Sequence, residues 1–181
     1  MPSSDVFPGS PAPKLRLMPT PDTEWLDTDQ QHAWRAYIGG TTMLIDRLDR
    51  ELRQAHDISL PEYEVLVRLS ESPDRTLRMA ALADAMAYSR SRITHTVARL
   101  ERAGLIRRGD DPTDRRGVTA RLTDVGFARL AEAAHTHVTG VREHLVALAG
   151  DADFEAVGRV FDAVTDHLAP EHGPAADIRG C

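Results

Sequence analysis

Two short stretches near the middle of this 181-residue chain carry side chains suited to binding a polyanion. The first runs from Ser89 to Ala103 and reads SRSRITHTVARLERA. Ile93, Val97 and Leu100 recur at spacings of three and four, which predicts an amphipathic helix with those three side chains buried. The opposite face would then present Ser89, Arg90, Ser91, Arg92, Thr94, His95 and Arg99.

Such a face suits double-stranded DNA for two reasons. A guanidinium can donate two hydrogen bonds to a guanine edge in the major groove, and hydroxyls and free N–H groups at a helix start can bind phosphates. The alternative is an ordinary solvated face, which is the commoner explanation for one charged helix considered alone. All the charged side chains on this face are basic, which favours the DNA-binding interpretation.

The second stretch, Asp110 to Thr123, reads DDPTDRRGVTARLT and mixes acids with adjacent arginines. Pro112 fixes a turn, and the two aspartates before it can hydrogen-bond the turn backbone. Asp114 is close enough in sequence to pair with Arg115 or Arg116 and hold a guanidinium extended. An arginine at a loop tip can enter the narrow, strongly negative minor groove. We therefore interpret the acids as positioning the arginines.

The distribution of charge agrees with this interpretation. From Ser89 to Arg121 there are nine arginines and four acids, a net charge of +5, which leaves −11 on the rest of a chain whose net charge is −6. Exposed charges more than about 8 Å apart are largely screened from one another at physiological salt. A local basic patch on an acidic protein can therefore act independently of the net charge.

The segments around these stretches predict the elements that position them. Apolar periodicity predicts a helix over 24–56, and Ser59 with Glu62 has the spacing of a capping box that starts a second helix. Leu77 to Met86 predicts a short helix, Ser89 or Ser91 caps the next, and Gly104 ends it. Strands starting at Leu105 and Gly117 form a hairpin around the charged turn. Thr123 caps a long helix reaching Leu148, and another helix spans 151–168.

This order predicts a mainly α protein with a small β-hairpin: a winged helix-turn-helix over about 59–122. The helices at 24–56 and 123–168 carry apolar stripes that one small lobe could not cover, so they are expected to form a dimerisation region. A palindromic DNA site also needs a two-fold protein. Residues 23–169 are expected to form a single domain. Residues 1–22, rich in proline, and residues 170–181 are expected to be disordered or flexible tails.

Residues 60–130 resemble the multiple-antibiotic-resistance regulator (MarR) family. The markers are the D-P-x-D-R-R-G…L-T run from Asp111 to Thr123 and the preceding SRSRITHTVARLERAGLIRR. The resemblance implies an obligate homodimer of winged helices, with small ligands often bound between the dimerisation region and the DNA-binding lobes. It also implies that Arg116 is the minor-groove arginine with Asp114 as its partner, and that Ser91, Arg92 and His95 face the major groove.

Other candidate sites are less distinct. Trp34, Tyr37, Tyr63 and Arg68 lie where the first two helices should meet, and would suit an aromatic carboxylate, although a place in the core is the commoner explanation for the aromatic residues. His137 and His144 share a helix face but are too far apart to ligate one metal alone. A zinc site would need a ligand from elsewhere, such as His32 or His56.

Several functional classes are excluded or disfavoured by the sequence. The single cysteine, Cys181, is the last residue, which leaves no internal disulfide, Cys-based zinc site or buried thiol sensor. No phosphate-binding loop or nucleophile motif points to an enzyme, and no cofactor or metal is expected. No stretch is long and apolar enough for a membrane span or a signal peptide, so a cytoplasmic protein is expected.

The combined expectation is a sequence-specific, DNA-binding transcriptional regulator. It would bind a palindromic operator as a homodimer, act as a repressor, and be released by a small aromatic or phenolic ligand. The alternatives are a zinc-responsive regulator of the same fold and a DNA-architectural protein.

Overall fold

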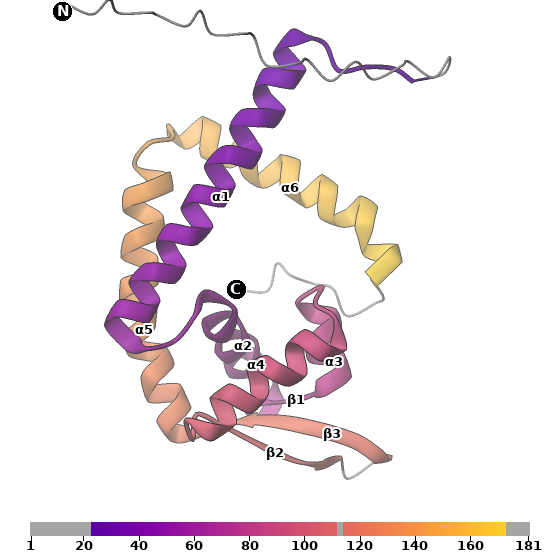
Figure 1. Cartoon of the computed structure of the whole chain (residues 1–181), viewed down its shortest axis with the longest axis vertical. Coiled ribbons are helices and arrows are strands. Elements are labelled where there is room, and N and C mark those ends of the chain that lie inside the picture. Colours follow the sequence, from indigo (N-terminus) through magenta and orange to yellow (C-terminus); the bar gives the residue numbers. More distant parts are fainter. Residues whose placement is uncertain (1–22, 112–113, 173–181) are drawn as a thin grey trace, which may run out of the picture. The chain divides into compact units, whose positions relative to one another are not determined.

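The computed structural model describes residues 23–111 and 114–172 (Figure 1). The chain divides into two units, residues 1–38 and 39–181. The described part of the first unit contains the start of helix α1 (Thr28–His56). The Gln30 amide donates to Asp27 Oδ1 at 2.8 Å and the Asp27 amide donates to Gln30 Oε1 at 3.0 Å. These reciprocal bonds satisfy N–H groups that the first helical turn leaves without partners.

The second unit contains the rest of α1 and the remaining elements. In chain order these are α2 (Leu60–Glu71), the 3-10 turn η1 (Pro73–Arg75), β1 (Thr76–Arg78), α3 (Met79–Ala85), α4 (Arg90–Arg102), β2 (Ile106–Asp111), β3 (Asp114–Leu122), α5 (Asp124–Val141), the π-helical turn η2 (Arg142–Val146) and α6 (Asp151–His172). The winged helix-turn-helix is therefore present, with α3 and α4 as its helix pair and β2–β3 as its wing.

Local capping residues set the ends of these helices, as the sequence predicts. Ser59 and Glu62 form a reciprocal capping box at α2, Ser89 caps α4, and the Thr123 hydroxyl accepts from the Gly126 amide at the start of α5. Gly104 follows α4 with a φ of 74°, a left-handed conformation that glycine adopts without a Cβ penalty.

The sheet has one strand more than the sequence predicts. Its three strands are antiparallel in the order β1-β3-β2, with Leu77 opposite Ala120 in the β1–β3 pair. The assignment of Leu77 to a helix is therefore wrong, and α3 begins only at Met79. Pairing with β3 fixes residues 76–78 as a strand, although their local pattern also suits the start of a helix.

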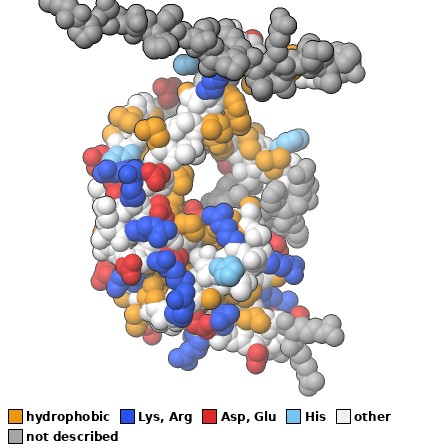
Figure 2. All heavy atoms as spheres, in the orientation of Figure 1, with side chains coloured by type: hydrophobic (Ala, Val, Ile, Leu, Met, Phe, Trp, Pro, Cys, Tyr) orange, Lys and Arg blue, Asp and Glu red, His pale blue; other side chains and the backbone are white. Residues whose placement is uncertain are grey.

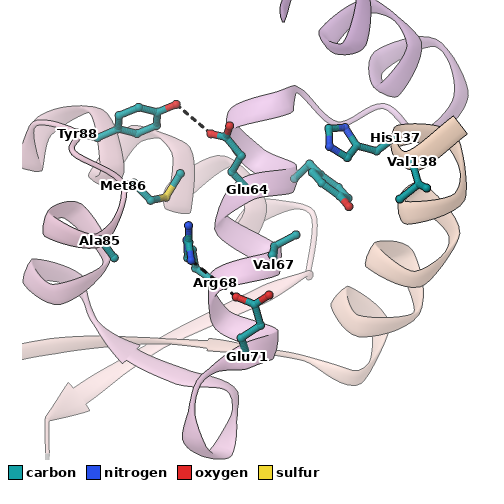
Figure 3. A pocket seen from close by; sticks show the side chains of 10 residues that line it. Glu64, Val67, Arg68, Glu71, Ala85, Met86, Tyr88, His137 and Val138 are labelled. Carbon is teal, nitrogen blue, oxygen red and sulfur yellow. Dashed lines mark hydrogen bonds and ion pairs between the residues drawn. The ribbon is translucent and has the colours of Figure 1, made fainter. Parts of the chain in front are cut away.

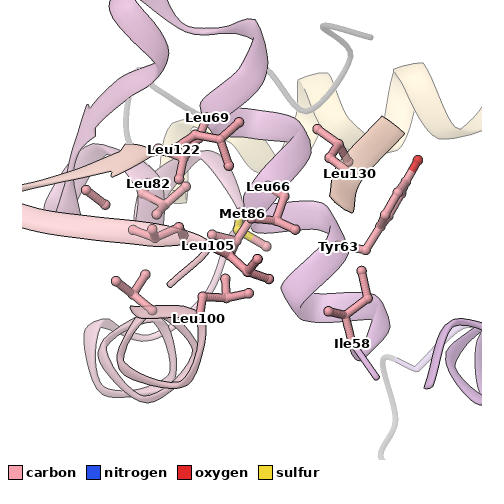
Figure 4. Close-up of a cluster of buried hydrophobic side chains, with 14 of the residues drawn as sticks. Ile58, Tyr63, Leu66, Leu69, Leu82, Met86, Leu100, Leu105, Leu122 and Leu130 are labelled. Atoms are coloured by element: carbon pink, nitrogen blue, oxygen red, sulfur yellow. The ribbon is translucent and has the colours of Figure 1, made fainter. Parts of the chain in front are cut away.

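The core of the winged helix lies between α2, α3, α4 and the sheet (Figure 4). Its fully buried side chains include Leu66, Leu69, Leu82, Ile93, Val97, Leu100 and Ile106. Each buried leucine or isoleucine contributes about 1.5–3 kcal/mol relative to an exposed one. The three apolar positions predicted for the buried face of α4 are all 0–1% exposed.

The C-terminal helices differ in detail from the prediction. The helix capped by Thr123 is α-helical only to Val141 and continues as the π-helical turn η2, where the sequence predicts α-helix to Leu148. α6 follows from Asp151 and carries exposed apolar side chains along its length. Within the described residues, none of the helices combines the length and apolarity needed to cross a membrane.

Candidate nucleic-acid interface

Helix α4 presents its whole predicted polar face to solvent. Ser89, Arg90, Ser91, Arg92, Thr94, His95 and Arg99 are all exposed, while the apolar side of the helix is fully buried. The Ser89 hydroxyl accepts from the Arg92 amide at 3.2 Å, which fixes the first turn of the helix. The Thr94 hydroxyl donates to the Arg90 carbonyl at 2.8 Å, so its oxygen remains available as an acceptor.

The guanidinium of Arg92 lies over an aromatic ring instead of extending freely. Its Cζ is 3.6 Å from the ring centroid of Tyr88, which immediately precedes the capping serine. The Tyr88 hydroxyl in turn donates to Glu64 Oε2 of α2 at 3.0 Å. The sequence analysis identified Arg92 from its place on the exposed helix face, whereas the hydrogen bond from Tyr88 to Glu64 exists only because the fold brings α2 close to the start of α4.

Arg99 has a partner in the core of the domain. Its Nε lies 2.7 Å from Glu62 Oε1, and the Glu62 side chain is only 4% exposed against 47% for Arg99. The other carboxylate oxygen of Glu62 accepts from the amide and the hydroxyl of Ser59, each at 2.7 Å. Arg99 therefore neutralises a buried carboxylate, in addition to its predicted place on the exposed face of α4.

Asp111, at the end of β2, anchors the base of the wing. Its side chain is buried and pairs with the half-exposed Arg78 of β1. A Cβ added at Gly117 would lie 2.7 Å from the Asp111 Cβ, so the glycine of the D-P-x-D-R-R-G run leaves room for this aspartate. The prediction that Asp111 hydrogen-bonds the turn backbone overlooked this role: the carboxylate holds an arginine from outside the charged turn.

The tip of the wing falls partly outside the described residues. Residues 112–113 are not described, and the side chains of Arg115 and Arg116 are not described either, although their backbone belongs to β3. Asp114 is exposed. The pairing of Asp114 with Arg115 or Arg116 and the minor-groove role of Arg116 stay predictions.

A groove of about 360 Å³ separates the start of α4 from the wing. Its lining includes Arg78 of β1, Arg90 of α4, and Asp114, Gly117 and Val118 of β3. Two guanidiniums at the edge of a groove beside a helix N-terminus are placed to bind phosphate. Arg78 is a candidate that the sequence analysis missed, because its place depends on the unpredicted strand β1.

Ion pairs with acidic side chains reduce the effective positive charge of the segment from Ser89 to Arg121. Glu101 Oε2 lies 2.6 Å from Arg108 Nη2, and the Arg108 hydrogen bonds hold the pKa of Glu101 below its usual value. In Figure 2, basic side chains nevertheless gather over the lower half of the face shown, in the area of α4 and the strands.

A cavity of about 690 Å³ lies between α2, the α3–α4 connection and α5 (Figure 3). Tyr63 and Arg68, two of the four predicted ligand-binding residues, line it together with Glu64, Tyr88 and His137. The other two, Trp34 and Tyr37, belong to the first unit, where their ring centroids lie 5.8 Å apart.

The charged groups of the cavity are partly paired. Arg68 Nη1 lies 3.8 Å from Glu71 Oε2, and the Arg68 side chain is 14% exposed. Burial raises the pKa of Glu64, against the opposing effect of the Tyr88 hydrogen bond. Burial also lowers the pKa of His137, whose ring centroid lies 4.6 Å from that of Tyr63.

The histidines of α5 and η2 do not meet around a common point. His144 Nε2 lies 2.9 Å from Glu51 Oε1, and His56 Nε2 lies 2.8 Å from Thr136 Oγ1, while His137 faces the cavity. Among residues 23–111 and 114–172 there is no group of three or more His, Cys, Asp or Glu side chains able to hold a metal ion. The described residues therefore offer no site in support of the zinc-responsive alternative.

Comparison with known proteins decides the family. The family model for MarR proteins matches residues 56–117. The chain is 30% identical to the transcriptional regulator HosA of Escherichia coli O111:H- over 95 residues, which are 52% of this chain and 69% of HosA. The chain belongs to the MarR family.

Two further transcriptional regulators are similar to this chain. The transcriptional regulator PecS of Dickeya dadantii (strain 3937) is 30% identical over 109 residues; the match covers 60% of this chain and just under two thirds, 66%, of PecS. The crystal structure of Sco3205, a MarR family transcriptional regulator from Streptomyces coelicolor in complex with DNA, is 40% identical with a TM-score of 0.77. That likeness covers 80% of this chain and 94% of Sco3205. These relatives are regulators, in agreement with the prediction of a protein without enzymatic activity.

Proposed function

We propose that this MarR-family protein binds a palindromic DNA operator as a homodimer and represses transcription from it. The observation that carries the proposal is the division of α4 into a fully buried apolar face and a fully exposed basic one, next to a groove with two arginines. The complex of Sco3205 with DNA supports the same use of the fold.

We propose that different parts of the site make different contacts with DNA. With α4 in the major groove, Arg92 reads a base edge and the start of the helix binds phosphate. Arg78 and Arg90, on the groove beside the wing, bind the phosphate backbone. Arg116 enters the adjacent minor groove, oriented by Asp114.

The apolar stripe of α6 supports the homodimer. Phe154, Val157, Phe161, Val164 and Leu168 follow the three-and-four spacing of one helix face, and each is 37–43% exposed. A contiguous exposed stripe of this kind marks an interaction surface, and a second copy of the chain would cover it. The two α4 helices would then read half-sites about 10 base pairs apart.

The cavity supports release by a small ligand. Its volume of about 690 Å³ lies within the usual range for ligand sites, ~300–1,000 Å³. Tyr63 and Met86 supply apolar surface, and the largely buried Arg68 supplies a cation. A small aromatic acid fits this chemistry.

The decisive experiment recovers genomic DNA fragments retained by the purified protein and measures binding to single-base variants of the selected site. Arg92→Ala is expected to lower discrimination at one base pair by about 1–3 kcal/mol. Arg116→Ala should weaken binding to all sites of similar groove width, and Asp114→Ala should do so to a smaller extent.

Arg159→Ala, in α6, is a matched control for loss of one exposed arginine. Binding should also weaken steeply with salt, with a slope of about −0.9 per neutralised phosphate in log–log form. Retention of fragments without a shared palindrome would indicate an architectural protein, and a flat salt response would contradict the assigned surface.

A further inference from the structure

Tyr88 occupies a junction between three parts of the domain. It lies between α3 and α4, and its amide donates to the Ala83 carbonyl of α3 at 3.0 Å. The next residue, Ser89, caps α4. Backbone contacts therefore fix the position of Tyr88 relative to both helices of the helix-turn-helix.

The side chain of Tyr88 is also held at its far end. Its hydroxyl donates to Glu64 Oε2 at 3.0 Å, so α2 restrains the ring (Figure 3). Burial beside Glu64 raises the pKa of Tyr88 to about 12, which keeps the hydroxyl protonated as a hydrogen-bond donor at neutral pH. The ring is thus fixed at both ends before any contact with DNA.

Arg92 lies across this fixed ring. Its guanidinium carbon is 3.6 Å from the ring centroid, although the residue is exposed and sits in the first turn of α4. A free arginine at such a position samples many rotamers, and ordering them on binding DNA costs conformational entropy. A guanidinium stacked on an aromatic face keeps its N–H groups available at the edge of its plane.

We propose that Tyr88 is a positioning residue for DNA recognition: its ring, anchored by Glu64, holds the Arg92 guanidinium ready for one base pair. The inference rests on the proposed function, because it needs Arg92 to contact a base. It adds to that function a residue that does not face the DNA itself and that links the lining of the cavity to the recognition helix.

A double-mutant cycle on the selected operator and its single-base variants tests the proposal. Tyr88→Leu is expected to lower discrimination about two- to fivefold, the range of an exposed cation–π contact, at the same base pair as Arg92→Ala. In the Arg92→Ala background, Tyr88→Leu should have no further effect at that base pair. Tyr88→Phe keeps the ring and loses only the Glu64 anchor, so it should restore most of the discrimination.

The structure offers a matched control in a second arginine–aromatic pair. The Arg75 guanidinium carbon lies 4.1 Å from the ring centroid of Phe127, away from α4, so Phe127→Leu should leave base discrimination unchanged. Thermal melting of each variant checks the fold. NMR spectroscopy tests the contact in the unmodified protein. The Arg92 Nε–H resonance should show the ring-current shift of a group stacked on an aromatic ring, and the Nε–H resonance of the exposed Arg102 serves as the reference.

The outcomes separate this inference from the proposed function. The positioning role is overturned, while the operator-binding function stands, if Arg92→Ala reduces discrimination and Tyr88→Leu gives any of three results. These are a loss of discrimination that is additive with that of Arg92→Ala, an equal loss at all base pairs, or a loss no larger than that of Tyr88→Phe. If Arg92→Ala changes nothing at any base pair, both the base contact and the inference fail. An Arg92 resonance without a ring-current shift would also overturn the inference.

Discussion

The ion pair between Arg99 and Glu62 leads to a prediction about stability as well as DNA binding. Arg99→Ala would leave Glu62 Oε1 without its guanidinium partner in a side chain that is only 4% exposed. A hydrogen bond to a charged group contributes about 1.5–3 kcal/mol to stability. Arg99 itself is half-exposed, so water can replace part of the contact, and we expect the lower end, about 1.5 kcal/mol.

Thermal unfolding can resolve an effect of this size. For a chain of this length, 1 kcal/mol shifts the Tm by about 2–4 °C, so Arg99→Ala should lower it by about 3–6 °C. Arg102→Ala removes an exposed arginine from the same helix and should leave the Tm unchanged. Operator binding measured on the same samples then separates the two roles of Arg99. An unchanged Tm with a large loss of operator affinity would refute the view that Arg99 mainly stabilises the buried carboxylate.

Three further outcomes follow from other contacts. Gly117→Ala should displace Asp111 and destabilise the wing by about 1–3 kcal/mol. Gly109→Ala should be tolerated, because the atom nearest to its added Cβ would lie 3.7 Å away. Chemical denaturation compares the free energies of unfolding of the two variants. Because burial lowers the pKa of His137, the unfolded chain binds that proton more tightly, and stability should fall as the pH drops below about 6.5. His137→Gln should reduce that slope, and an unchanged slope would contradict the assignment. Phe161→Glu, in the α6 stripe, should shift the protein from dimer to monomer in sedimentation at micromolar concentration; a stable dimer would exclude α6 from the interface.

The sequence predicts the winged helix well because its signals are local. Ser59 and Thr123 each cap the helix that they are expected to start, Ser89 is the cap of α4 from the two serines that the sequence offers, and Gly104 ends α4. These positions are predictable because a cap needs only the few residues around it. Leu77 was misassigned because its strand exists only through pairing with Ala120, more than forty residues later. No local periodicity contains that information.

The same distinction applies to the site. The exposed face of α4 follows from the spacing of its apolar residues, so its members could be named in advance. Arg78 could not, because its place depends on the strand β1 and on its partner Asp111. The anchoring of Tyr88 could not be named either, because Glu64 belongs to another helix. Arg99 illustrates the remaining limit: a helix-face pattern gives the direction of a side chain but not whether a neighbouring carboxylate already binds it.

The anchoring of the wing at Asp111 and Gly117 has a consequence for how such proteins diversify. In addition to the pairing of β1 with β3, the wing is attached to the rest of the sheet by side-chain contacts at Asp111, Gly117 and Arg78, outside the segment 112–116. Because those side-chain contacts lie outside the segment, they can be kept while the segment is exchanged for the equivalent residues of another family member. Such a chimera, with Asp111, Gly117 and Arg78 retained, tests whether operator preference can be transferred between family members independently of the fold.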